Sequence, residues 1–61
     1  MVDYTKALTQ FQLLRSAGLE RESAMSKTCT WLGLDYDSDE DTICDVKAFL
    51  NLNDVVREFE E

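Results

Sequence analysis

The chain has 61 residues, enough for one small domain, and a formal net charge of −7. Its two cysteines are too few for a disulfide framework, and its apolar runs are too short to form a membrane helix. The absence of histidine removes the commonest catalytic base. We therefore expect an intracellular, cytoplasmic protein that does not bind membranes.

The first predicted helix covers about residues 4–17. Asp3 is the expected N-cap. Gly18 is expected to end the helix in a left-handed conformation, with Leu19 folding back on the final turn. The apolar positions at three- and four-residue spacing are Tyr4, Ala7, Leu8, Phe11 and Leu14.

The second predicted helix covers about residues 21–32. Acidic residues Glu20 and Glu22 suit the positive end of a helix dipole, and Gly33 followed by Leu34 repeats the stop pattern. Trp31 lies at the edge of the predicted buried stripe. That stripe consists of Ala24, Met25, Thr28, Cys29 and Leu32.

The third predicted helix covers about residues 39–50, with Ser38 opening a capping box. Its apolar positions are Ile43, Val46, Phe49 and Leu50. Asn51-Leu-Asn53 predicts a turn, after which Val55, Val56 and Phe59 can support a short fourth helix. The sequence thus predicts an all-α, three-helix bundle, with a short fourth helix at the C-terminus as an open alternative, forming one domain over residues 1–61.

Most of the negative charge falls in residues 35–45, DYDSDEDTICD, which we name the acidic run. It holds six carboxylates and no cation, whereas the rest of the chain holds seven acids against six bases. Three of its acids, Asp39, Glu40 and Asp41, are accounted for by a favourable interaction with a helix dipole. The other three lie outside the first helical turn and favour a cationic partner.

Calcium and phosphate are two alternative interpretations of the acidic run. Asp35, Asp37 and Asp39 match the first ligands of an EF-hand loop, but the glycine, aliphatic and glutamate positions hold Glu40, Thr42 and Val46. Ser38, followed by Asp-Glu-Asp, is an acidophilic kinase context in a eukaryotic cell.

We expect the acidic run to bind a basic protein surface, such as the phosphate-binding groove of a nucleic-acid enzyme. In size, helical pattern and charge the chain resembles small acidic inhibitors of nucleases, restriction systems and polymerases, many of them phage-encoded. Trp31 and Tyr36 flank Gly33 next to the run and would supply apolar anchors, with packing of Trp31 across the core as the alternative. The expected contact residues are Trp31, Asp35, Tyr36, Asp37, Asp39, Glu40, Asp41 and Asp45.

A different interpretation of the chain rests on two short apolar segments, Ala17-Gly18-Leu19 and Phe49-Leu50. The chain from about residue 7 to 50 is similar to ubiquitin-associated domains, which bind ubiquitin through a Met-Gly-Phe loop and an apolar pair late in the third helix. Here Ala and Leu replace the Met and Phe. The resemblance implies a recognition module that binds through apolar residues.

Other functions find little support in the sequence. We expect no catalysis, metal or cofactor, because the two cysteines have no histidine partner and no glycine-rich phosphate loop is present. Direct DNA binding is opposed by the carboxylates at the start of the third helix. The cations Lys6, Arg15, Arg21 and Lys27 are interpreted as a solvated face. A homodimer is an alternative to a monomer.

Overall fold

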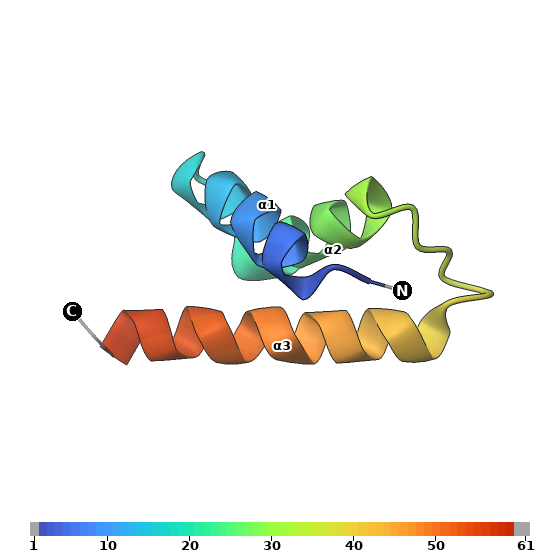
Figure 1. The fold of residues 1–61 in the computed structure, drawn as a ribbon. Helices are drawn as coiled ribbons and strands as arrows, with labels where there is room; N and C mark the ends of the chain where they lie inside the picture. The colour runs from blue at the N-terminus through green and yellow to red at the C-terminus, as the bar shows by residue number, and fades with distance from the viewer. Residues whose placement is uncertain (1, 60–61) are drawn as a thin grey trace.

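The computed structural model describes residues 2–59, which contain three helices and no strand. Helix α1 spans Tyr4–Ser16, α2 spans Arg21–Trp31 and α3 spans Glu40–Phe59. Helices α1 and α2 pack together on one side of the longer α3 (Figure 1). The predicted all-α, three-helix architecture is confirmed.

The ends of α1 and α2 are built in the same way. The Gly18 N–H donates to the Arg15 carbonyl, and the Leu19 N–H donates to the Leu14 carbonyl. This pair of hydrogen bonds defines a Schellman motif, in which the glycine takes a positive φ, here 101°. Both predicted glycine stops are therefore confirmed, since the second turn has the corresponding pattern.

At the second turn, the Gly33 N–H donates to the Thr30 carbonyl and the Leu34 N–H donates to the Cys29 carbonyl. The φ of Gly33 is 81°. Leu34 packs against the core, as its counterpart Leu19 does after the first turn. Each leucine thus covers the end of the helix that precedes it.

The prediction of a turn at residues 51–53 and a separate fourth helix was wrong, because α3 continues through this segment. Both asparagine side chains make hydrogen bonds that a continuous helix allows. Asn53 Nδ2 donates to the Phe49 carbonyl one turn back, and Asn51 Oδ1 accepts from Arg21 Nη1. Tertiary packing here overrides the local preference of asparagine for turns.

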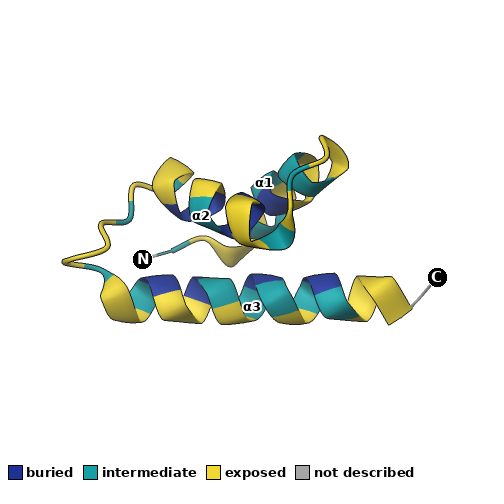
Figure 2. Ribbon diagram, turned by 180° about the vertical axis from the view of Figure 1, so that it is seen from behind, coloured by how far each residue is buried: buried dark blue, intermediate teal, exposed yellow. Residues whose placement is uncertain are grey.

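The hydrophobic core lies between α3 and the α1–α2 pair. Its buried members are Ala7, Phe11, Ala24, Met25, Cys29, Ile43, Val46 and Leu50. Figure 2 shows that the buried positions of α3 face the other two helices, whereas its opposite side is exposed. Tyr4 is more exposed than its place in the predicted stripe implies, and its ring packs edge-on against Phe49 with centroids 5.1 Å apart.

Candidate functional site

The acidic run occupies the connection from α2 to α3 and the first turns of α3, at one end of the molecule (Figure 1). Helix α3 begins at Glu40, and the carbonyl of Asp39 accepts the N–H of Ile43. Asp39 therefore takes the N-cap position that the sequence assigned to Ser38. Ser38 itself is exposed in the turn before the helix.

Two carboxylates of the acidic run organise the connection itself. The Asp35 N–H donates to Asp39 Oδ2 at 2.9 Å, and the Asp39 N–H donates to the Asp35 carbonyl at 2.7 Å. Asp35 Oδ1 in turn accepts the Asp37 N–H at 2.8 Å, which is an Asx turn. Asp35 and Asp39 thus have a structural role that the sequence alone did not indicate.

The other four carboxylates of the run project from an already formed scaffold. Asp37, Glu40, Asp41 and Asp45 are exposed, and none of them forms a salt bridge with another described residue. Glu40 and Asp41 lie in the first turn of α3, where the helix dipole stabilises their negative charge. This end of the molecule therefore carries negative charge that no described cation neutralises through an ion pair.

The two predicted aromatic anchors are both at the surface. Trp31 is 53% exposed and Tyr36 is 54% exposed. Lys47 of α3 places its ammonium group 5.6 Å from the centroid of the Tyr36 ring, a cation–π distance. Trp31 instead borders a hollow of about 330 Å³, together with the α1 residues Thr5, Lys6, Thr9 and Gln10.

The carboxylates of the run do not gather into a metal site. Among residues 2–59, no group of three or more aspartate, glutamate, cysteine or histidine side chains could hold a metal ion. Asp35 and Asp39 direct carboxylate oxygens toward backbone N–H groups rather than toward a common centre.

A second polar cluster joins the three helices beside the α1–α2 turn, and we name it the charge cluster. Its members are Arg15, Arg21, Asp54 and Glu58. Arg21 Nε lies 2.6 Å from Asp54 Oδ2, and Arg15 Nε lies 3.4 Å from Asp54 Oδ1. The interpretation of Arg15 and Arg21 as a solvated face was wrong, because both side chains are partly buried and paired.

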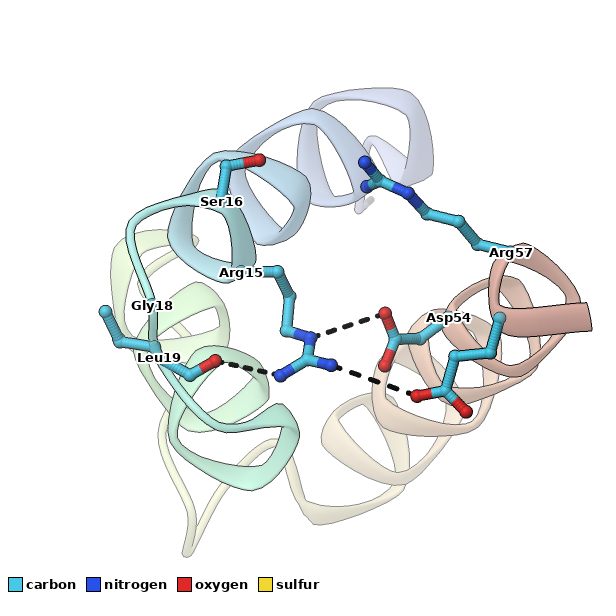
Figure 3. Close-up of a pocket in the computed structure, with 7 residues that line it drawn as sticks. Arg15, Ser16, Gly18, Leu19, Asp54 and Arg57 are labelled. Carbon is cyan, nitrogen blue, oxygen red and sulfur yellow. Dashed lines mark hydrogen bonds and ion pairs between the residues drawn. The ribbon is translucent and has the colours of Figure 1, made fainter. Parts of the chain in front are cut away.

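The charge cluster borders a pocket of about 340 Å³, shown in Figure 3. Arg15 Nη1 donates to the Leu19 carbonyl at 2.9 Å, and its other nitrogens face Asp54 and Glu58. The hydrogen bond to Asp54 raises the pKa of Arg21, and Glu58 adds to this effect. Within the pocket the charges of Arg15, Asp54 and Glu58 are therefore paired, whereas Arg57 also lines it and forms no salt bridge with another described residue.

The two cysteines differ in their surroundings. Cys29 is fully buried, and the loss of solvation raises the pKa of its thiol. Cys44 is exposed on α3. A buried, protonated thiol behaves as a small apolar side chain, which fits the role of Cys29 in the core.

The residues of the ubiquitin-associated resemblance are not presented together. Leu50 is fully buried in the core, Phe49 is partly buried, and Leu19 packs against the same core. These side chains hold the bundle together, so little of their apolar surface faces solvent.

No protein-family model, curated protein or solved structure matches the chain. None of the helices within residues 2–59 has both the length and the apolar character needed to span a bilayer.

Proposed function

We propose that this chain is an intracellular, non-catalytic protein-binding module whose acidic run engages a basic surface on its partner. The partner class with the matching chemistry is a nucleic-acid-binding enzyme, whose cationic groove accepts closely spaced phosphates. Occupation of that groove by the module would inhibit the enzyme.

The observation that carries this proposal is the separation of two kinds of carboxylate. Asp54 and Glu58 are matched by arginines, whereas Asp37, Asp41 and Asp45 are exposed and have no ion-pair partner among the described residues. Unpaired negative charge on a formed scaffold attracts a basic surface over a Debye length, about 8–10 Å at physiological salt. The association is therefore expected to be fast and to weaken with salt.

The interlocked hydrogen bonds of Asp35 and Asp39 support the same proposal. They fix the connection before any partner arrives, so less conformational entropy is lost on binding. Trp31 and Tyr36 remain the proposed apolar anchors beside this charge, because each leaves about half of its surface exposed.

The ubiquitin-associated alternative remains a proposal with less support. Its expected contact surface includes Leu50, whose side chain is fully buried. Binding through this residue would require the core to open.

The test compares two charge-matched double variants. Asp37→Asn/Asp45→Asn removes two exposed carboxylates of the acidic run and spares the turn made by Asp35 and Asp39. Glu20→Gln/Glu22→Gln changes the net charge equally at exposed positions of another segment. Each immobilised variant is presented with proteins that a heparin column enriches from cell lysates, at low and high salt.

The expected result is capture of a basic nucleic-acid-binding protein by the native chain and the control, with at least tenfold less by the acidic-run variant. The activity of the captured enzyme should fall when the native chain is added. Equal capture by both double variants, or capture that salt does not weaken, would overturn the proposal.

A further inference from the structure

The side of α3 that faces away from the other helices carries an exposed row of residues, which we name the outer stripe. Its members are Asp41, Asp45, Ala48, Leu52, Val56 and Phe59. They recur at spacings of three and four residues, which places them on one face of the helix. All six are exposed, in agreement with the uncovered side of α3 in Figure 2.

The C-terminal half of the outer stripe is strongly apolar. Leu52 is 65% exposed, Val56 is 54% exposed and Phe59 is 85% exposed. The buried face of the same helix is formed by Ile43, Val46 and Leu50, so these three exposed residues are not needed for the core. A row of large exposed apolar side chains is typical of an interaction surface.

The N-terminal half of the outer stripe is acidic. Asp41 and Asp45 are the first two residues of the stripe, and neither forms a salt bridge with a described residue. The stripe contains no cation. A complementary surface therefore needs positive charge at one end and apolar side chains at the other.

A second copy of this chain does not meet that requirement. In a parallel pairing, Asp41 and Asp45 would face the same carboxylates of the other copy and repel them. In an antiparallel pairing, Asp41 would lie against Phe59 and lose its solvation without gaining a counter-charge. An anionic lipid surface would likewise repel Asp41 and Asp45, because its headgroups are also negatively charged.

The shape of the outer stripe favours a helical partner. From Asp41 to Phe59 the stripe covers eighteen residue steps, about 27 Å at the 1.5 Å rise of an α-helix. A row of residues at three- and four-residue spacing is the pattern by which two helices keep a long shared contact.

We propose that the outer stripe of α3 binds a basic amphipathic helix of a partner protein. Lysine or arginine side chains in one half of that helix pair with Asp41 and Asp45. Apolar side chains in its other half cover Leu52, Val56 and Phe59. The electrostatic half of this proposal rests on the proposed function, whereas the apolar half stands on the exposure of α3 alone.

The experiment uses two fluorescently labelled, helix-forming peptides of about twenty residues, the length needed to follow α3. Each has leucines at three- and four-residue spacing in one half and lysines in the other, and the two peptides differ in which half comes first. Fluorescence anisotropy measures their binding to the full chain at low and high salt.

Four variants separate the contributions. Leu52→Gln/Val56→Thr/Phe59→Ser removes the apolar half, and Asp41→Asn/Asp45→Asn removes the charge. Leu13→Gln is the matched control, because Leu13 is 61% exposed but lies on α1. Asp37→Asn tests whether the peptide binds instead to the connection between α2 and α3. All the substituted side chains are exposed, and circular dichroism checks that each variant keeps its helical content.

We expect one of the two peptides to bind the native chain and Leu13→Gln equally. Binding should weaken at least tenfold with the apolar variant, and the aspartate variant should bind with little salt dependence. If apolar dependence is found without salt dependence on the aspartates, the electrostatic proposal fails while the apolar contact stands.

Three results would overturn the inference. The first is that neither peptide binds. The second is that binding depends on Asp37 and not on the apolar residues, in which case the proposed function stands alone. The third is sedimentation as a dimer that Leu52→Gln/Val56→Thr/Phe59→Ser converts to a monomer, since a second copy would then cover the stripe.

Discussion

Asp54 accepts a hydrogen bond from Arg21 Nε at 2.6 Å, which links the start of α2 to the C-terminal half of α3 across thirty-three positions of sequence. The carboxylate is only 6% exposed, and Arg15 from the end of α1 approaches its other oxygen. One side chain therefore contacts a cation from each of the other two helices.

Replacing Asp54 with alanine should destabilise the fold. The change leaves two partly buried guanidinium groups without their shared acceptor, and losing a buried hydrogen-bonding partner costs about 1–3 kcal/mol. The free energy of unfolding, measured by urea denaturation, should fall within that range. Glu58→Gln is the control, because Glu58 is mostly exposed and its pairs should contribute under about 1 kcal/mol. Equal effects of the two changes would contradict the importance of the buried carboxylate.

Alanine at Gly18 or Gly33 should also destabilise the chain. Both glycines have positive φ, and an added Cβ would meet no atom within 4 Å at either position. The cost is therefore backbone strain rather than a clash, about 1–2 kcal/mol for an L residue in this region. Urea denaturation of each variant measures it. D-alanine, introduced by chemical synthesis, favours positive φ and should avoid the loss; a loss as large as that of L-alanine would count against the strain.

Thiol labelling should distinguish the two cysteines. Cys44 is exposed and should react with a disulfide reagent at a rate close to that of the unfolded chain. Cys29 is buried with its pKa raised, so its reaction should await unfolding. Mass spectrometry of the labelled chain identifies the modified residue at each time. Simultaneous labelling of both thiols under native conditions would show that the core opens readily.

The raised pKa of Cys29 also predicts a loss of stability at alkaline pH. Burial keeps the native thiol protonated, whereas the thiol of the unfolded chain ionises near its ordinary pKa of about 8.5. The unfolded state then binds fewer protons, so the contribution is complete below that pKa and declines as pH rises toward the native value. Cys29→Ala should reduce the slope of unfolding free energy above pH 8.5, and Cys44→Ser should leave it unchanged. A slope unaffected by Cys29→Ala would contradict the assignment.

The sequence predicted the parts of this fold that depend on residues close together in the chain. Regular apolar spacing and the pairs Gly18-Leu19 and Gly33-Leu34 located α1 and α2 to within one residue at each end, because a Schellman motif is determined by residues close in sequence. The predicted third helix ended before Asn51, because asparagine favours turns. In the structure α3 continues through Asn51, whose side chain accepts a hydrogen bond from Arg21 of a different helix. No local pattern records such a contact.

The candidate site was also predicted only in part. The charge of the acidic run and the exposure of Asp37 or Asp45 follow from composition, but the interlocked bonds of Asp35 and Asp39 require the folded turn. Asp54 was missed, although it lies four residues after Leu50 on the buried face of a continuous helix. Extending that spacing beyond the asparagines would have found it.

The shared use of Asp54 by two arginines has a consequence for how the chain folds. Arg15 and Arg21 lie on either side of the turn that joins α1 to α2, so closing this hairpin alone would bring two positive charges together. Docking of α3 supplies the negative charge between them. Hairpin closure and α3 docking are thus energetically coupled, and the protein is expected to fold in a single cooperative transition without a stable hairpin intermediate.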